Sequence, residues 1–254
     1  LRVNIGVHAN THDFLATARE DQKFGVSIAD AVSLVAKIRS HSHLEFIGLH
    51  SHIGSQIHAR EGFVESVKRL IKLHAELSKD GEIPELNLGG GFGINYKPAD
   101  DAPDIHDFAE ALAVAVKVEC HKHGVAVPVL AFEPGRVIAG NPGVTLYTVG
   151  TIKDVQVSDA DAVRKYVSVD GGMSDNARPA LYEAEYHCVL AGRASDAAPA
   201  LVRVVGKHCE SGDIVVRHDY LPADVAPYDL LAVAATGAYC YSLSSNYNFL
   251  PKPP

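Results

Sequence analysis

Short apolar runs alternate with longer segments of helical periodicity in the first half of the chain. Apolar side chains recur every three or four residues between Arg60 and Leu77 and again over residues 104–123, which predicts two amphipathic helices. Gly81 and Gly124 follow these segments, at positions where a glycine commonly ends a helix. This order of elements predicts parallel strands with right-handed crossovers. The expected strands, the last of which reads as buried, are residues 44–50, 85–88 and 127–132.

The pattern changes after about Gly140. Alternating positions now predominate, and few helical patterns separate them, which predicts a second, mainly antiparallel β domain. The expected strands of this domain are residues 145–157, 166–169, 200–205, 213–217 and 230–235.

Charge and hydropathy exclude several classes of partner. The 254 residues carry a net charge of −8, without a long block of Lys and Arg. Nucleic acids and anionic membranes are bound through basic clusters, so neither is expected as a partner. No apolar run approaches the roughly 20 residues of a membrane helix, and no signal-peptide pattern is present.

The cysteines are few and widely spaced, without a C-x-x-C pair. A zinc ribbon or a disulfide framework is therefore not expected. We expect instead a cytoplasmic protein whose cysteines are reduced thiols. The four positions are Cys120, Cys188, Cys209 and Cys240.

Polar residues follow each of the three predicted parallel strands. In parallel α/β barrels the active site is built from the carboxyl ends of the strands, so these residues are expected to share one rim. The candidates are His50, His52 and Ser55 after the first strand, residues 89–91 after the second, and Glu133 and Arg136 after the third.

The three consecutive glycines at residues 89–91 have two interpretations. Backbone N–H groups of glycines can approach an anion closely, and with the hydroxyl of Ser55 they would suit a phosphate. The same glycines can instead form only a tight turn. The sequence alone leaves both interpretations open.

His50 and His52 lie on the same side of an extended segment. Such a pair can bind a metal, or one ring can stack on a planar cofactor, or both can be ordinary half-buried histidines. A metal site needs further ligands at other strand ends. The next strand ends instead offer glycines, Glu133 and Arg136, which disfavours a metal.

Glu133 and Arg136 could form a structural ion pair. A carboxylate at a strand end can also pair with a protonated ring nitrogen, which is how proteins make pyridoxal phosphate (PLP) an electron sink. A nearby arginine would help to keep the carboxylate ionised.

These segments, taken in order, resemble the fold-type III PLP-dependent decarboxylases. The resemblance spans the chain and is closest to the diaminopimelate decarboxylases, because of residues 170–182 (DGGMSDNARPALY) and 209–213 (CESGD). The other matching segments are 52–55 (HIGS), 89–91 (GGG), 133–136 (EPGR) and 237–239 (GAY).

The resemblance implies an α/β fold: a partial (β/α)8 TIM barrel over residues 1–140, followed by a mainly antiparallel β domain over residues 141–254. It implies a homodimer whose subunits share active sites. The implied reaction is PLP-dependent decarboxylation of meso-2,6-diaminopimelate to L-lysine and CO2, the last step of lysine biosynthesis.

The resemblance also implies roles for single residues. His52 should stack on the pyridine ring, Glu133 should bind its nitrogen, and Cys209 should return a proton to Cα after CO2 leaves. Cofactor-binding positions are His52, Ser55, Gly91, Glu133, Gly135, Arg136 and Tyr239. Substrate-binding positions are Arg136, Arg178, Tyr182, Glu210 and Tyr239.

These roles suit the substrate, which carries a carboxylate and an ammonium at each end. An arginine binds a carboxylate directionally, and Glu210 can recognise the ammonium of the far end. The carbanion left by decarboxylation needs one proton from a positioned acid, which a thiol can supply. Without the resemblance, Cys209 would be taken for a small buried hydrophobic residue.

One family feature has no counterpart. The lysine that binds PLP lies upstream of the histidine motif in the family, and no segment here matches it. Lys23 belongs to a different motif and is not assigned. Residues 1–7 read as a strand already under way, and residues 250–254 end soon after an ordered-looking segment. We therefore expect an incomplete chain, inactive alone, whose partial barrel leaves strand edges uncovered.

Three alternatives stay open. An ornithine- or arginine-type decarboxylase would share the fold and cofactor, a metal-dependent hydrolase would contain zinc, and a regulator on the same fold would have lost the cofactor residues. His52, Glu133, Arg136, Cys209 and Tyr239 are all present, which argues against the regulator.

Overall fold

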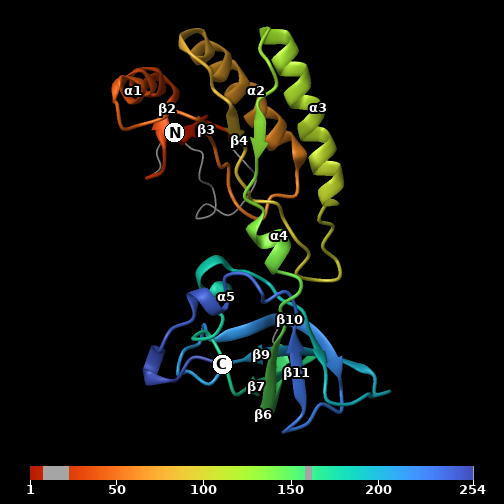
Figure 1. The fold of residues 1–254 in the computed structure, drawn as a ribbon. Helices are drawn as coiled ribbons and strands as arrows, with labels where there is room; N and C mark the ends of the chain where they lie inside the picture. The colour runs from red at the N-terminus through yellow and green to blue at the C-terminus, as the bar shows by residue number, and fades with distance from the viewer. Residues whose placement is uncertain (8–22, 158–161, 254) are drawn as a thin grey trace. The chain divides into compact units, whose positions relative to one another are not determined.

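The computed structural model describes residues 1–7, 23–157 and 162–253. The chain divides into two compact units (Figure 1). The α/β unit comprises Leu1–Ile94 and Asp101–Val137, and the β unit comprises Asn95–Asp100 and Ile138–Pro254. The boundary expected between residues 140 and 141 stays a prediction. Each unit is described by itself.

Parallel strands form the centre of the α/β unit. Three strands pair in the order β3-β4-β5, with Leu49, Leu86 and Leu130 in register. A parallel bridge between Arg2 and His50 adds the β1–β2 pair beside β3. The bounds are β1 Val3–Asn4, β2 Val26–Ser27, β3 Gly48–His50, β4 Glu85–Asn87 and β5 Val129–Ala131.

The crossover helices begin and end at the residues that their sequences favour. The helix α3 (Ile105–His123) begins after Asp104, whose carboxylate accepts a hydrogen bond from the N–H of His106. It ends at Gly124, which has a φ of 67°. The helix α2 (Arg60–Leu77) continues into a 3-10 turn, η2 (Ser78–Asp80), before Gly81. The helix α1, which precedes β3, spans Ile28–Ser40 and is capped by Ser27.

Three aromatic rings fasten the helices to the loop that follows β4. The ring of Phe92, from this loop, stacks on Phe63 of α2 with centroids 5.0 Å apart. Phe108 of α3 meets both rings edge-on, at 5.4 and 5.5 Å. All three side chains are buried. The glycine loop is thereby held against the core between two helices that lie side by side (Figure 1).

The third strand differs from its prediction as a buried strand. Val129 of β5 is 68% exposed, and the neighbouring Val127 and Phe132 are also exposed. The reason is that β5 is the edge strand of its sheet and, among the residues described, pairs only with β4.

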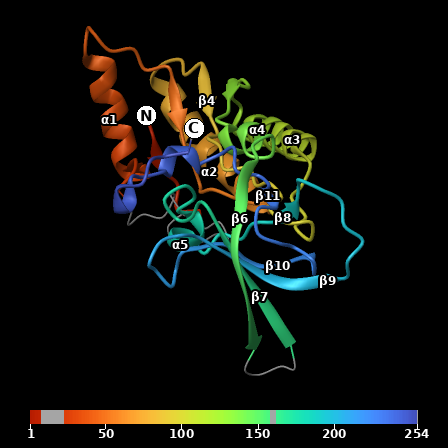
Figure 2. The same cartoon turned by 90° about the horizontal axis from the view of Figure 1, so that it is seen from below.

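The β unit is built around a six-stranded sheet in the order β10-β9-β7-β6-β11-β8. Every neighbouring pair is antiparallel except β7 and β9, so the mainly antiparallel β domain is confirmed. Strands β6 and β7 form a long hairpin (Figure 2). The bounds are β6 Thr145–Val157, β7 Ala162–Val169, β8 Cys188–Leu190, β9 Pro199–Val205, β10 Ile214–Pro222 and β11 Leu230–Val233.

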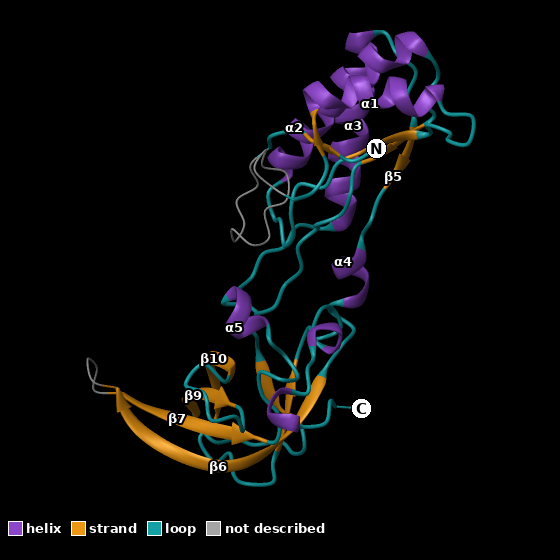
Figure 3. Ribbon diagram, turned by 90° about the vertical axis from the view of Figure 1, so that its left-hand side faces the viewer, coloured by secondary structure: helices purple, strands orange, loops and turns teal. Residues whose placement is uncertain are grey.

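Helices contribute little to the β unit, whereas the long helices α1, α2 and α3 belong to the α/β unit (Figure 3). The short helix α4 (Gly135–Ala139) lies where the chain passes from one unit to the next. The β unit contains α5 (Arg178–Tyr182) and two 3-10 turns, η3 (Tyr241–Leu243) and η4 (Tyr247–Phe249). No helix in the described part of the chain is long and apolar enough to cross a membrane.

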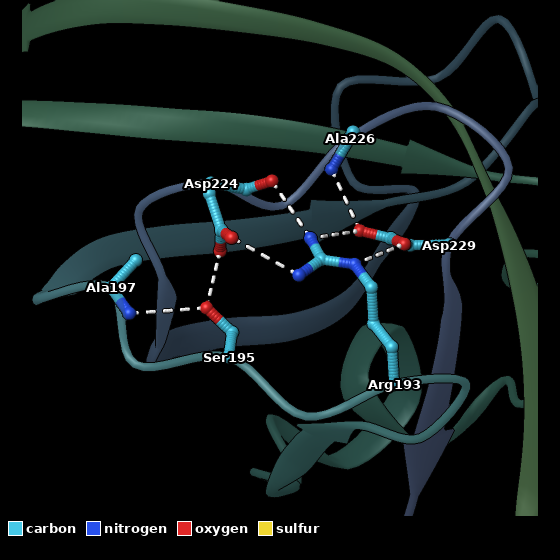
Figure 4. Close-up of polar contacts among 6 residues, drawn as sticks. All are labelled: Arg193, Ser195, Ala197, Asp224, Ala226 and Asp229. Atoms are coloured by element: carbon cyan, nitrogen blue, oxygen red, sulfur yellow. Dashed lines mark hydrogen bonds and ion pairs between the residues drawn. The ribbon is translucent and has the colours of Figure 1, made fainter.

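A polar cluster joins the loop between β8 and β9 to the loop between β10 and β11 (Figure 4). Both edges of Arg193 are engaged, because it donates two hydrogen bonds of 2.9 Å to the carboxylate of Asp229. It also donates one of 3.0 Å to the carboxylate of Asp224 and one of 2.9 Å to the carbonyl of Asp224. Ser195 also donates to Asp224, at 2.7 Å. The bonds from Arg193 lower the pKa of Asp229. These groups satisfy one another, so the cluster has a structural role.

Candidate functional site

The ends of β3, β4 and β5 bring three polar side chains together in the α/β unit. The carboxylate of Glu133 lies 3.5 Å from Nε2 of His50 and accepts a hydrogen bond of 3.2 Å from the amide of Asn87. Its side chain is 50% exposed, and its backbone N–H donates to the carbonyl of Gly89. Glu133 is therefore a carboxylate that is held by its neighbours and still accessible.

Asn87 was not predicted from the sequence. It is the last residue of β4 and its side chain also accepts a hydrogen bond from the N–H of Gly89 at 2.8 Å. The sequence could have indicated Asn87 as a site residue, because it lies at the carboxyl end of a strand, directly before the glycine loop. Such positions supply active-site residues in parallel barrels.

The ring of His52 is fixed by the glycine loop. Its Nδ1 accepts a hydrogen bond of 3.1 Å from the N–H of Gly90, so a neutral ring carries its proton on Nε2. Burial lowers the pKa of His52, Arg2 lowers it further, and Glu133 opposes both. The pKa of His50 is also lowered, chiefly by burial. Both rings are therefore favoured in the neutral form.

The glycines at residues 89–91 let three strand-end loops meet backbone to backbone. A Cβ at Gly90 would overlap the carbonyl oxygen of Glu133, and a Cβ at Gly91 would overlap that of Gly54. Gly91 also has a φ of 103°, where side chains are rarely tolerated. The fold itself thus requires these glycines, and their contact with a phosphate stays a prediction.

Replacing Gly90 by alanine is expected to lower the free energy of unfolding by at least about 2 kcal/mol, because the overlapping atom is a backbone oxygen that cannot rotate away. The matched control is Gly62→Ala in α2, whose new Cβ would lie 3.4 Å from Cδ1 of Ile53. That change should cost nothing, since alanine favours helices. Denaturant titration of both variants measures the difference, and equal midpoints would contradict the packing argument.

Arg136 and Ser55 are joined directly. Nη2 of the buried Arg136 donates a hydrogen bond of 2.8 Å to Oγ of Ser55. The contact links α4 to the loop after β3 and places a guanidinium beside a hydroxyl, a pairing suited to an anion. Nothing lies within 4 Å of a Cβ at Gly135, so packing does not require a glycine there.

In the β unit, Asp213 connects the two segments on which the closest family resemblance rests, residues 170–182 and 209–213. Its buried carboxylate accepts hydrogen bonds from the N–H groups of Met173, at 2.6 Å, and His208, at 2.7 Å. A Cβ at Gly172 or Gly206 would lie too close to this carboxylate. The last residue of the CESGD motif therefore positions the loop of residues 170–176 and has a structural role that the sequence did not reveal.

Arg178 and Tyr182 lie on α5. Arg178 is 3% exposed, and its Nη1 donates a hydrogen bond of 2.6 Å to the hydroxyl of Tyr186. Tyr182, at the other end of this short helix, is half-buried.

Cys209 and Glu210 lie on an exposed turn. Cys209 is an exposed free thiol, whereas Cys120, Cys188 and Cys240 are buried. The alternative of a small buried hydrophobic residue is therefore wrong for Cys209. The hydroxyl of Tyr247 donates a hydrogen bond to Glu210, which raises the pKa of Tyr247.

Tyr239 lies two residues after Gly237, where the backbone packs closely against that of Ala139. A Cβ at Gly237 would overlap the carbonyl oxygen of Ala139. Tyr239 itself has a φ of 65° and a side chain that is 46% exposed.

Each unit thus gathers its own part of the predicted site. The α/β unit holds His52, Ser55, Gly91, Glu133, Gly135 and Arg136, and the β unit holds Arg178, Tyr182, Cys209, Glu210 and Tyr239.

The chain is similar to known decarboxylases over its whole length. It is 52% identical over 261 residues to diaminopimelate decarboxylase of Mycobacterium tuberculosis (strain H37Rv), covering 100% of this chain and 58% of that protein. Diaminopimelate decarboxylase from M. jannaschii in co-complex with L-lysine superposes with a TM-score of 0.87 at 32% identity, over 99% of this chain and 56% of that one. The Helicobacter pylori enzyme complexed with L-lysine gives 0.86 at 28% identity, over 99% and 59%.

The chain therefore spans less than two thirds of the length of the relatives it matches. Residues 1–140, more than half of the chain, match the family described as pyridoxal-dependent decarboxylase, pyridoxal binding domain. The chain therefore has the α/β fold of these relatives, as a partial barrel followed by a β domain. The chain belongs to the pyridoxal-dependent decarboxylase family.

Proposed function

We propose that this chain carries the greater part of a diaminopimelate decarboxylase, which converts meso-2,6-diaminopimelate to L-lysine and CO2 with PLP as cofactor. The strongest support is the 52% identity to a diaminopimelate decarboxylase over the entire chain. Two structural relatives hold L-lysine, which is the product of this reaction.

The residues of the α/β unit fit the chemistry of PLP. When bound, PLP supplies an electron sink for the bond that breaks at Cα. Glu133 offers an accessible carboxylate for a protonated ring nitrogen, and the fixed, neutral ring of His52 suits stacking. Arg136 and Ser55, which share a hydrogen bond, would form a donor pair for the phosphate. Gly91 and Gly135 of the same unit, and Tyr239 of the β unit, would be its further contacts.

The β unit supplies groups for the substrate. Arg178 and Tyr182, together with Arg136, would bind a carboxylate, and Glu210 would bind the ammonium at the far end. Cys209 would deliver a proton to Cα, for which an exposed thiol is suited. We propose that Cys209 and Glu210 act in the active site of the partner subunit of a homodimer, and that the enzyme works in the cytoplasm.

No lysine of this chain is proposed to bind the cofactor. Nζ of Lys23 lies 5.1 Å from the centre of the Phe24 ring, and Lys23 is exposed. The metal-dependent alternative gains no support, because no three His, Cys, Asp or Glu side chains among the described residues gather as metal ligands.

The cofactor assignment is tested by borohydride reduction. This chain and a chain extended upstream are mixed with PLP, reduced and weighed intact. We expect one phosphopyridoxyl group on an upstream lysine of the extended chain and none on this chain. Stoichiometric labelling of Lys23 would refute that expectation, and no labelling of either chain would refute the cofactor. Turnover of ornithine in preference to meso-diaminopimelate would replace the proposed substrate.

A further inference from the structure

Arg178 is a buried cation without a carboxylate partner in the described part of the chain. It is 3% exposed, and Nη1 of its guanidinium donates a hydrogen bond of 2.6 Å to the hydroxyl of Tyr186. Burial alone lowers its pKa, but Tyr186 and Tyr96 reverse the effect and raise the pKa above its usual value. A buried charge is normally paired, because its removal from water is costly. A buried guanidinium without a carboxylate partner is therefore suited to bind an anionic group of a ligand.

Two tyrosine rings enclose this guanidinium. Cζ of Arg178 lies 4.8 Å from the centre of the Tyr96 ring and 5.7 Å from that of Tyr186. The two rings meet edge to face, with centroids 5.2 Å apart. Sγ of the buried Cys240 lies 3.4 Å from the hydroxyl of Tyr186. We call Tyr96 and Tyr186 the tyrosine cage.

Tyr96 comes from a segment far away in the sequence. Residues Asn95–Asp100 pack with the β unit, although the residues on both sides of them belong to the α/β unit. The carboxylate of Asp100 accepts hydrogen bonds from the N–H groups of Tyr96 and Lys97, at 2.8 and 3.0 Å. Lys97 forms an ion pair with Glu185, next to Tyr186. Asp100 thus closes the turn that contains Tyr96, and the ion pair ties this turn to the segment that contains Tyr186. Tyr96 is 8% exposed.

We propose that Tyr96 and Tyr186 are positioning residues that aim Arg178 at a carboxylate of the substrate. This inference rests on the proposed function, which makes Arg178 a substrate ligand. A ring over the guanidinium face provides a cation–π contact, and the phenol oxygen at Nη1 fixes one edge of the plane. Because the guanidinium is planar, these two restraints set the direction of its remaining N–H donors.

The test is a set of tyrosine variants in the extended, PLP-loaded protein. Tyr96→Leu removes the ring and should raise KM for meso-diaminopimelate by about ten-fold or more while kcat falls less, as expected for a lost cation–π restraint. Tyr96→Phe keeps the ring and should restore KM to within about two-fold. Tyr186→Phe keeps the ring but removes the hydroxyl that accepts from Arg178 and contacts Cys240, and should raise KM by at least about three-fold. The control is Tyr220→Leu, an exposed tyrosine of β10, which should leave KM unchanged.

The positions of the guanidinium can also be followed without turnover. In protein labelled with ¹⁵N-arginine, the Arg178 signals are those lost in Arg178→Lys. We expect slow rotation and separate Nη signals in the unmodified protein, and averaged signals in Tyr96→Leu. Unchanged signals and an unchanged KM in Tyr96→Leu would overturn the inference, as would an equal loss in Tyr96→Phe. If the unmodified protein does not act on meso-diaminopimelate, the proposed function fails. Averaging of the Arg178 Nη signals in Tyr96→Leu then decides by itself whether the tyrosine cage holds Arg178.

Discussion

Replacing Glu133 by glutamine in the PLP-loaded protein is expected to lower kcat/KM for meso-diaminopimelate by about 10²–10³-fold, the usual loss when a preorganised electrostatic partner is removed. Glutamine has nearly the same shape, but its neutral amide cannot stabilise a protonated ring nitrogen. The carboxylate is half-exposed and accepts a hydrogen bond from the amide of Asn87, which glutamine can replace, so the fold should change little. The expected loss is therefore electronic.

The matched control is Glu110→Gln, at an exposed position on α3 that carries the same change of charge. It should keep kcat/KM within about two-fold, as surface substitutions do. Absorbance of the bound cofactor separates loss of PLP from loss of its electronic activation. A Glu133→Gln protein that holds PLP and keeps more than about a tenth of its kcat/KM would show that Glu133 is not the ring partner, since a ten-fold change is only 1.4 kcal/mol.

Elements with strong local signals could be predicted closely. The helix α3 begins one residue after its Asp104 cap and ends at Gly124, because both ends are set by residues that make their own hydrogen bonds. Strand β6 has the expected bounds, since apolar and polar residues alternate over much of its thirteen residues. Strand β8 was missed because three residues are too few to show a period.

Features that depend on distant residues could not be predicted. The exposure of Val129 follows from the place of β5 at the edge of its sheet, which the local apolar run does not encode. Likewise, no local pattern connects Tyr96 with Tyr186 or assigns residues 95–100 to the β unit. The carboxyl ends of the parallel strands and the family resemblance together predicted the candidate site residues. The supporting residues Asn87 and Asp213 emerged only from the hydrogen bonds.

Replacing Cys209 by alanine is expected to lower the rate of L-lysine formation by about 10²–10⁴-fold, the range for loss of a positioned general acid. Cys209 is exposed while the other three cysteines are buried, so removing its thiol should not disturb the core. The control is Ser211→Ala, two residues further along the same exposed turn, which should keep the rate within about two-fold. Release of CO2 and formation of L-lysine are measured separately, because a missing proton donor affects product formation most directly.

Mixing the two inactive variants then tests whether Cys209 serves the partner subunit. If each active site takes Glu133 from one subunit and Cys209 from the other, a mixed dimer of Glu133→Gln and Cys209→Ala subunits has one intact site. Random exchange should then restore roughly one quarter of the unmodified activity, since half of the dimers are mixed and each has one working site of two. If both residues acted within the same subunit, every site in the mixture would lack one of them and no activity would return. Recovery of activity on mixing would therefore support the shared site of the homodimer, and its absence would place the proton donor in its own subunit.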